Sequence, residues 1–272
     1  MQIFIKPQLP PLVVTSAGQF MVCNSAYEFH DWLTPDIMKN SDGFVICDPT
    51  GYLHERYANL FKRSGYAVKT FDTSNLRDSN RYNPFAYVRD NRDVAKLVTA
   101  FIGGTSGYRY YGDIKFLAAE VALMSALFGY IANEAPSFER NINSVIETLK
   151  YMRADDGRDV FNDENYKHAV DFLFEQLEER DPNCFAVQRY TEFKLTAGHF
   201  ANIVVNSCIW RLEPFAADAV KDRFTEDELA FDSFAYGEKT AIFVSPAMSG
   251  DFDFLVSLFY TQLFDVLCEE LA

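Results

Sequence analysis

Three adjacent segments of this sequence constrain the fold more than any other feature. Gly43 to Cys47 (GFVIC) is a continuous apolar run that ends at the turn Asp48 to Gly51, which is the pattern of a buried strand. Tyr52 to Ser64 has apolar residues at helical spacing, and Tyr66 to Phe71 predicts a second strand. A strand, a helix and a strand at this spacing predict a βαβ unit, and therefore a parallel sheet.

Other predicted strands lie near both ends of the chain. Leu12 to Val14 and Gln19 to Cys23 are short apolar strands that precede the βαβ unit. Thr240 to Ser245 (TAIFVS) predicts another buried strand, and Phe252 to Leu271 predicts an amphipathic helix. The chain therefore returns to the sheet at its end.

The middle of the chain has a helical pattern instead, and its most apolar segment is expected to be central to its domain. We predict an α/β domain interrupted by helices: residues 1–92 form its first part, 93–218 form an all-helical insertion, and 219–272 return to the α/β domain. The predicted helices of the insertion are Val94 to Ile102, Ile114 to Asn133 (the most apolar), Phe138 to Met152, Tyr166 to Arg180 and Cys184 to Leu212.

The charge of the chain narrows the class of partner. There are 39 Asp and Glu residues against 25 Lys and Arg, which gives a formal net charge of -14. Proteins that bind nucleic acid draw much of their affinity from Lys and Arg that neutralise phosphates. This composition therefore argues against direct DNA binding and favours protein or small-molecule partners.

Cysteine and histidine patterns predict neither a metal nor another cofactor. The five cysteines are scattered without a CxxC pair, as expected for free thiols in a reducing cytoplasm. No HExxH spacing occurs, and His199 and Cys208 lie about two and a half turns apart on one predicted helix. A calcium loop is the alternative for one acidic stretch, but its residues lack EF-hand order and predict a solvated loop. They are Asp155, Asp156, Asp159, Asp163 and Glu164.

Hydropathy does not predict a membrane span. No uninterrupted apolar run reaches the roughly 20 residues that cross a bilayer. Residues Met1 to Val14 contain three prolines and resemble neither a signal peptide nor a membrane helix. We expect a cytoplasmic chain whose association with the inner membrane, where it occurs, is made through partners.

Several separated landmarks occur in a recognisable order and spacing. They resemble the coupling proteins of type IV secretion and conjugation, the TraG/TraD-type DNA-transfer ATPases, over most of the chain from about Phe20. The resemblance implies a RecA-like nucleotide-binding domain with an inserted all-helical domain, in hexamers at the inner membrane that pass DNA–protein substrates to a secretion channel. The expected fold is thus α/β, with a partial RecA-like parallel sheet. The landmarks are Asp48-Pro49-Thr50-Gly51-Tyr52, Gly65-Tyr66-Ala67-Val68, Arg81-Tyr82-Asn83-Pro84-Phe85, Glu178 to Pro182, Lys194 to Gly198 and Thr240 to Phe264.

The largest departure from this family is in the phosphate-binding loop, which the family places after the strand equivalent to Gln19 to Cys23. A P-loop needs glycines for close backbone approach, a Lys for the β/γ-phosphates and a Ser or Thr for Mg²⁺. Here the segment has no glycine, no lysine and no hydroxyl at its end, and Glu28 falls near the lysine position. A carboxylate there would repel triphosphate. The degenerate positions are Asn24, Ser25, Ala26, Tyr27, Glu28 and Phe29.

Two further family motifs differ. The Asp-Pro-Lys-Gly-Glu turn has Thr50 and Tyr52 in place of its Lys and Glu. Asp48 is either an orphaned catalytic acid or simply a turn-forming residue at a strand end. The second acidic motif of the family is expected just beyond Ala272. We also expect the family's N-terminal membrane helices to be absent from this chain. We therefore expect a truncated member with a degenerate P-loop that is not an enzyme on its own.

One basic-aromatic cluster is a candidate for nucleic-acid contact. Arg109, Tyr110, Tyr111 and Lys115 combine cations with rings that can stack on bases. The alternative is an ordinary surface loop before a helix.

These observations lead to one main functional hypothesis. The chain is a catalytically silent, coupling-protein-like component of conjugative DNA transfer, and its helical domain binds a relaxase, other secretion-system proteins or a full-length coupling ATPase. The alternatives are an ATPase that is active only with a partner supplying the missing motifs, and a decayed remnant of a mobile element.

Overall fold

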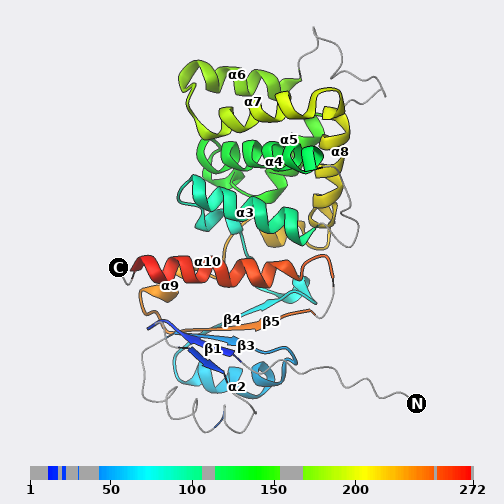
Figure 1. The fold of residues 1–272 in the computed structure, drawn as a ribbon. Helices are drawn as coiled ribbons and strands as arrows, with labels where there is room; N and C mark the ends of the chain where they lie inside the picture. Colours follow the sequence, from blue (N-terminus) through cyan, green and yellow to red (C-terminus); the bar gives the residue numbers. More distant parts are fainter. Residues whose placement is uncertain are drawn as a thin grey trace, which may run out of the picture. The chain divides into compact units, whose positions relative to one another are not determined.

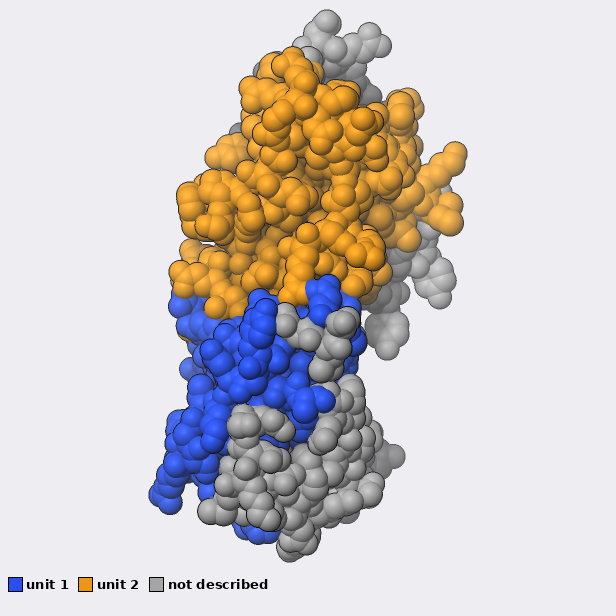
Figure 2. Space-filling model, turned by 90° about the vertical axis from the view of Figure 1, so that its left-hand side faces the viewer, with its two compact units in different colours: residues 1–82, 228–272 blue, residues 83–227 orange. Residues whose placement is uncertain are grey.

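The computed structural model describes residues 12–17, 20–22, 30, 43–105, 114–153, 168–247 and 250–270 (Figure 1). The chain divides into two compact units, coloured separately in Figure 2. Unit 1 consists of residues 1–82 and 228–272, and unit 2 consists of residues 83–227. The domain boundaries expected from the sequence, after residues 92 and 218, both fall within unit 2.

The described part of unit 1 contains one five-stranded sheet, with the order β2-β1-β3-β5-β4. Strands β3, β5 and β4 run parallel, as predicted, whereas β1 is antiparallel to both of its neighbours. The strands are β1 (Leu12–Thr15), β2 (Phe20–Val22), β3 (Phe44–Cys47), β4 (Ala67–Asp72) and β5 (Thr240–Ser245).

The predicted βαβ unit is present, but its two strands are separated by a third strand from near the end of the chain. Helix α2 (Tyr52–Arg63) connects β3 to β4, but these two strands are not neighbours. Strand β5 lies between them, with Phe44 opposite Ala241 on one side and Ala67 opposite Thr240 on the other. The predicted return of the chain to the sheet is therefore confirmed.

Side chains alternate along each strand, so each strand places apolar residues on both faces of the sheet. Helices cover both of these faces. Phe44 and Phe243 point to the face that α2 covers, where they pack against Phe61. Phe71 points to the opposite face and stacks on Phe259 of α10. Figure 1 shows α2 on one side of the sheet and α10 on the other. The helices of this second layer are α9 (Phe231–Ala235) and α10 (Phe254–Glu270).

Unit 2 is helical in its described part, and α4 is its centre. Helix α4 packs against α3, α5, α7 and α8, as expected for the most apolar segment. The α-helices are α3 (Asn91–Gly104), α4 (Ile114–Glu134), α5 (Ile142–Tyr151), α6 (Ala169–Arg180), α7 (Phe185–Ala197) and α8 (Ala201–Leu212). Among the described residues, the short 3₁₀ turns are η1 (Leu76–Asp78), η2 (Pro84–Tyr87), η4 (Ser137–Glu139), η6 (Gly198–Phe200), η7 (Glu213–Ala216) and η8 (Lys221–Phe224).

The single helix predicted from Cys184 to Leu212 is wrong. The chain breaks at Gly198, where φ is +49° and ψ is −128°, a backbone conformation that side-chain-bearing residues rarely adopt. Helix α7 ends before this residue and α8 begins after the turn η6. His199 and Cys208 therefore do not share one α-helix, because His199 lies in the turn.

Helix α4 is also the one described helix that is long and apolar enough to cross a membrane by length and composition. Its most apolar stretch is 61% buried inside the protein. A core helix passes the same test, and α4 carries the fully buried Glu120 at a contact with α8. Its burial is explained by its central place in unit 2.

Candidate functional site at the carboxyl edge of the sheet

Four strands of the sheet end at the same edge. Strand β2 runs in the same direction as β3 because β1 is antiparallel to both. Leu12 of β1 pairs with Val22 on one side and with Cys47 on the other, so the ends of β2 and β3 are about 10 Å apart. Ligands of open α/β sheets bind at such a carboxyl edge. The degenerate loop positions Asn24 to Phe29 follow β2 but lie outside the described residues.

The turn after β3 is organised by the buried side chain of Asp48, which is 1% exposed. One carboxylate oxygen, Oδ2, accepts a hydrogen bond of 2.8 Å from the backbone amide of His54, in the first turn of α2. The other, Oδ1, accepts a hydrogen bond of 3.2 Å from the hydroxyl of Thr50. Asp48 therefore caps a helix N-terminus, where the free amides favour a negative charge.

Gly51 makes this cap possible. It has φ of +73° in the left-handed region, immediately before α2 begins at Tyr52. Its amide donates to the carbonyl of Asp48 at 3.2 Å, which closes the turn. The half-exposed Tyr52 side chain accepts from Arg56 one turn along the helix. Of the landmark Asp48-Pro49-Thr50-Gly51-Tyr52, the acidic, hydroxyl and glycine residues thus serve the turn itself.

The ends of β5 and β4 are tied together in the same way. The amide of Thr73 donates to the carbonyl of Ser245 at 3.0 Å, and the hydroxyl of Thr73 accepts from the amide of Ala247 at 2.8 Å. After β4, the carboxylate of Asp72 accepts from the amide and the hydroxyl of Ser74. Most of the donors in these turns are therefore paired within the protein.

The chemistry of this edge is acidic. Residues 48–52, 72–75 and 245–247 include two carboxylates, Asp48 and Asp72, and neither Lys nor Arg. Cys47 ends β3 beside them, and burial raises the pKa of its thiol to about 11. At neutral pH this sulfur stays protonated and is a poor nucleophile. The described part of the edge thus provides neither a cation for phosphate nor an activated nucleophile.

The family comparison agrees with the order of these elements. The model of the type IV secretory system conjugative DNA transfer family matches residues 32–271. The chain belongs to this family. The membership gives the protein a role in conjugative DNA transfer and an association with components of that system. No curated protein matches the chain.

The second site predicted from the sequence is the basic-aromatic cluster, a candidate for nucleic-acid contact in this member of the conjugative DNA transfer family. Arg109, Tyr110 and Tyr111 lie outside the described residues. Lys115 lies in the first turn of α4, is exposed, and lines a pocket of unit 2. The described residues contain no group of three or more His, Cys, Asp or Glu side chains arranged to hold a metal ion.

Sequence reasoning did not find the other residues of this pocket. It is lined by segments of α4, α7, η6 and α8 that are about 80 residues apart in the chain. One signal was present, since the landmark Lys194 to Gly198 ends at the glycine where α7 stops. The remaining lining residues are Phe116, Ala119, Thr196, Ala197, His199, Phe200 and Val204.

Proposed function

We propose that this chain is a catalytically silent member of the conjugative DNA transfer family, and that its helical unit binds protein components of the transfer system. The observation that carries the proposal is the sequence of the loop where a nucleotide would bind. The loop after β2 reads CNSAYEF, without Gly or Lys. The described turns at the carboxyl edge of the sheet add the carboxylates of Asp48 and Asp72.

Electrostatics and sterics both support this reading. Phosphate binding in P-loop proteins uses free backbone amides, a Lys and a bound Mg²⁺. At this edge the amide of His54 already donates to Asp48, and the amide of Ala247 already donates to Thr73. A triphosphate would therefore lose its water shell without gaining equivalent partners.

The helical unit supports the second half of the proposal because its described helices pack around a specific buried ion pair. Glu120 of α4 and Arg211 of α8 form a buried pair with two hydrogen bonds, of 3.0 and 2.9 Å. Arg211 also donates to the carbonyl of Ile102 at 3.3 Å and so links α3 to the pair. A unit with such a specific interior presents a defined surface to partners.

Calorimetry with ATP and Mg²⁺ on the purified chain tests catalytic silence. We expect no saturable heat at millimolar nucleotide and no phosphate release above the uncatalysed rate. A crystal with an ATP analogue whose phosphates lie beside Glu28 would overturn the proposal. Hydrolysis that appears only after a full-length coupling ATPase is added would instead support activity completed by a partner.

Binding experiments test the partner half. The whole chain, immobilised, is exposed to the purified relaxase and secretion components of the same conjugative system. We expect at least one of them to bind, and we expect no binding of double-stranded DNA at physiological salt because the net charge is -14. Failure of all these proteins to bind would remove this half of the proposal.

A further inference from the structure

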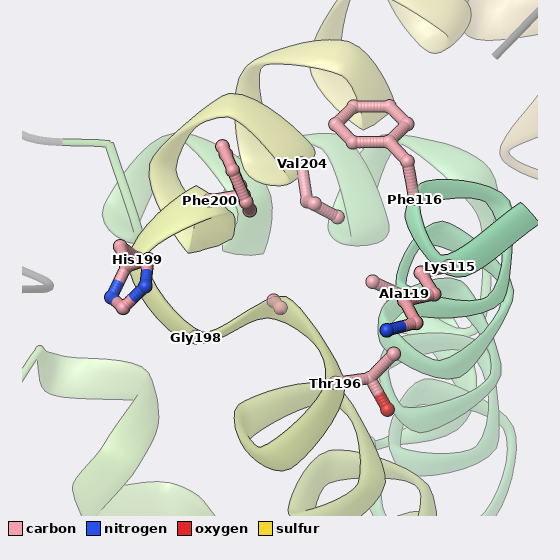
Figure 3. Close-up of a pocket in the computed structure, with 9 residues that line it drawn as sticks. Lys115, Phe116, Ala119, Thr196, Gly198, His199, Phe200 and Val204 are labelled. Atoms are coloured by element: carbon pink, nitrogen blue, oxygen red, sulfur yellow. The ribbon is translucent and has the colours of Figure 1, made fainter. Parts of the chain in front are cut away.

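Unit 2 has a second hollow, of about 540 Å³, which we call the α5–α6 hollow. The end of α4, one face of α5 and the start of α6 line it. It differs from the pocket described above, which Figure 3 shows and whose described lining includes Lys115 and His199 and neither Asp nor Glu. The described lining of the α5–α6 hollow includes no Lys, Arg or His, and it has three glutamates, Glu134, Glu139 and Glu147.

The α5–α6 hollow combines a buried apolar floor with exposed apolar walls. Ile131 of α4 and Val170 of α6 line it and are buried. Tyr151 of α5 and Leu173 of α6 also line it, and they are 71% and 38% exposed. Covering apolar surface of this kind is favourable by about 25 cal/mol per Å². Exposed apolar side chains in the wall of a hollow are typical of an interaction surface.

Several hydrogen-bond donors in the wall of the α5–α6 hollow are already used within unit 2. The backbone amides of Asn143 and Ser144 both donate to the side chain of Asn141, at 3.0 and 3.2 Å. The side-chain amide of Asn143 donates to the carbonyl of Lys221 at 3.0 Å. The hydroxyl of Thr148 donates to the carbonyl of Ser144 at 2.7 Å. An anionic ligand would therefore compete with bonds that the protein already makes.

The carboxylates of the α5–α6 hollow are more available than these donors. Glu134 pairs with the exposed Arg180, and Glu147 pairs with the exposed Lys150 at 2.7 Å. Exposed ion pairs contribute little to stability, so both glutamates can exchange partners at low cost. Within the part of the chain that the structure describes, the carboxylate of Glu139 has neither an ion pair nor a hydrogen bond. A cationic ligand would therefore find an open acceptor.

Tyr130, which also lines the hollow, reports the same negative field. The pKa of its hydroxyl is raised, mainly by burial and then by the charge of Glu134. Arg180 opposes this effect in part, and Glu139 adds to it. The negative charges thus act inside the hollow, in spite of the nearby cation.

We propose that the α5–α6 hollow binds a segment of a partner protein in which an arginine lies among apolar side chains. The guanidinium pairs with Glu139, and the apolar side chains cover Tyr151 and Leu173. Arginine fits better than lysine because its planar guanidinium bonds a carboxylate through two parallel hydrogen bonds and stacks on aromatic rings. The inference rests on the proposed function, because it names the surface through which the helical unit binds a transfer component.

Peptides matched in charge provide the probe, because a chain with a net charge of -14 attracts any basic peptide. Three short synthetic peptides share one apolar sequence around a single central residue. This residue is Arg, Lys, or citrulline, which is the neutral isostere of Arg. Binding to the whole chain is measured by fluorescence anisotropy. We expect the Arg peptide to bind about 3-fold more tightly than the Lys peptide and about 10-fold more tightly than the citrulline peptide.

Variants at exposed residues connect the binding to the hollow without disturbing the core. Glu139→Gln is expected to weaken the Arg peptide about 10-fold and to remove most of its advantage over citrulline. Tyr151→Ser is expected to weaken all three peptides. The matched controls, Glu179→Gln and Tyr236→Ser, change the same residue types at exposed positions that do not line the hollow. The controls are expected to bind as the unmodified chain does.

Three outcomes would overturn the inference. The first is an Arg peptide that binds no more tightly than the Lys or the citrulline peptide. The second is a preference for Arg that is unchanged in Glu139→Gln. The third is sedimentation as a dimer that Glu139→Gln abolishes, because the hollow would then hold a second copy of this chain.

The relaxase separates this inference from the proposed function. A relaxase that binds the unmodified chain and Glu139→Gln equally leaves the function standing and rejects the hollow as its site. Specific binding of the Arg peptide, without binding of any transfer component, rejects the partner half of the function but leaves the hollow with its specificity.

Discussion

At the carboxyl edge of the sheet in unit 1, the carboxylate of Asp48 is buried and accepts hydrogen bonds from its own turn. In the pocket of unit 2 that α4, α7, η6 and α8 line, Lys115 is exposed near apolar side chains. The first region uses polar groups to hold the backbone, whereas the second has polar and apolar groups at the surface of the protein. In the described residues, the polar groups at the edge of the sheet are thus used within the protein, whereas those of the unit 2 pocket reach its surface.

The interior of unit 2 differs from that of unit 1 in a related way. Unit 1 is held together by apolar and aromatic packing, with Phe71, Tyr82 and Phe259 in mutual ring contact. Unit 2 has a buried ion pair, Glu120 with Arg211, at the contact between α4 and α8. Buried pairs cost desolvation energy but make one arrangement of the helices much better than the others. The pair joins α4 to α8, which both line the pocket.

The largest expected effect comes from breaking that pair. Glu120→Leu leaves the buried guanidinium of Arg211 without its carboxylate, and we expect the free energy of unfolding to fall by about 3–5 kcal/mol. Urea denaturation followed by far-UV circular dichroism measures the change. The double variant Glu120→Leu with Arg211→Met removes both charges and is expected to recover most of the loss. A single variant as stable as the unmodified chain would contradict the buried pair.

A smaller effect is expected at the turn that shapes the pocket. Gly198→Ala places a side chain at φ of +49°, and we expect a loss of about 1–3 kcal/mol in the free energy of unfolding. Gly103→Ala in α3 is the matched control, because both positions have open space where a Cβ would be added. The control is expected to be neutral or to gain up to about 1 kcal/mol. Equal effects at the two glycines would remove the argument for a special turn.

A third prediction concerns Asp48 at the carboxyl edge of the sheet, where the comparison assigns it a structural role. Asp48→Ala removes the cap of α2 and is expected to cost about 1 kcal/mol of stability. Asp48→Asn keeps an acceptor oxygen for the amide of His54 and is expected to cost less. Thermal denaturation of the two variants measures the difference. If Asp48→Asn instead abolished a measurable nucleotide hydrolysis, Asp48 would be catalytic and the capping role insufficient.

The smallest effect depends on pH. Desolvation alone would raise the pKa of Asp171, but hydrogen bonds from Lys194, the amide of His168 and Tyr190 lower it below its usual value. A carboxyl whose pKa is lowered on folding stabilises the protein above its unfolded pKa of about 3.9. That stabilisation is lost as the pH falls through the lower folded value.

Asp171→Asn cannot titrate, so it provides the comparison. We expect it to be less stable than the unmodified chain at pH 7, by under about 1 kcal/mol because Lys194 is partly exposed. The difference is expected to shrink as the pH falls below about 4. Urea midpoints measured at both pH values show this, and a difference that does not depend on pH would contradict the assignment.

The strands that could be predicted from the sequence are those with a local hydrophobic pattern. GFVIC and TAIFVS are continuous apolar runs bounded by polar residues, and both are buried strands within one or two residues of their predicted ends. The fold class follows from the strand–helix–strand order. The antiparallel pairing of β1 with β2 follows from the short connection between them, because parallel neighbours need a longer crossover. The pairing of β1 with β3 has no such local signal.

The site was less predictable than the fold. The apolar periodicity from Cys184 to Leu212 continues through Gly198, so the glycine itself is the one local sign of the break that creates the pocket. Lys115 and Thr196 meet only through tertiary packing of α4 against α7. The role of Asp48 was easier, since an Asp-Pro pair at a strand end already favours a turn.

The central place of β5 in the sheet has a consequence for synthesis of the chain. Residues 240–245 fill the gap between β3 and β4, and they are translated after the whole of unit 2. The ribosome therefore releases a continuous helical unit while the sheet still lacks its middle strand. Unit 2 can fold during translation, whereas unit 1 must wait for a contact of high sequence separation. Limited proteolysis of ribosome-bound chains long enough to expose unit 2 but not β5 would show a protected unit 2 beside a cleavable β3–α2–β4 segment.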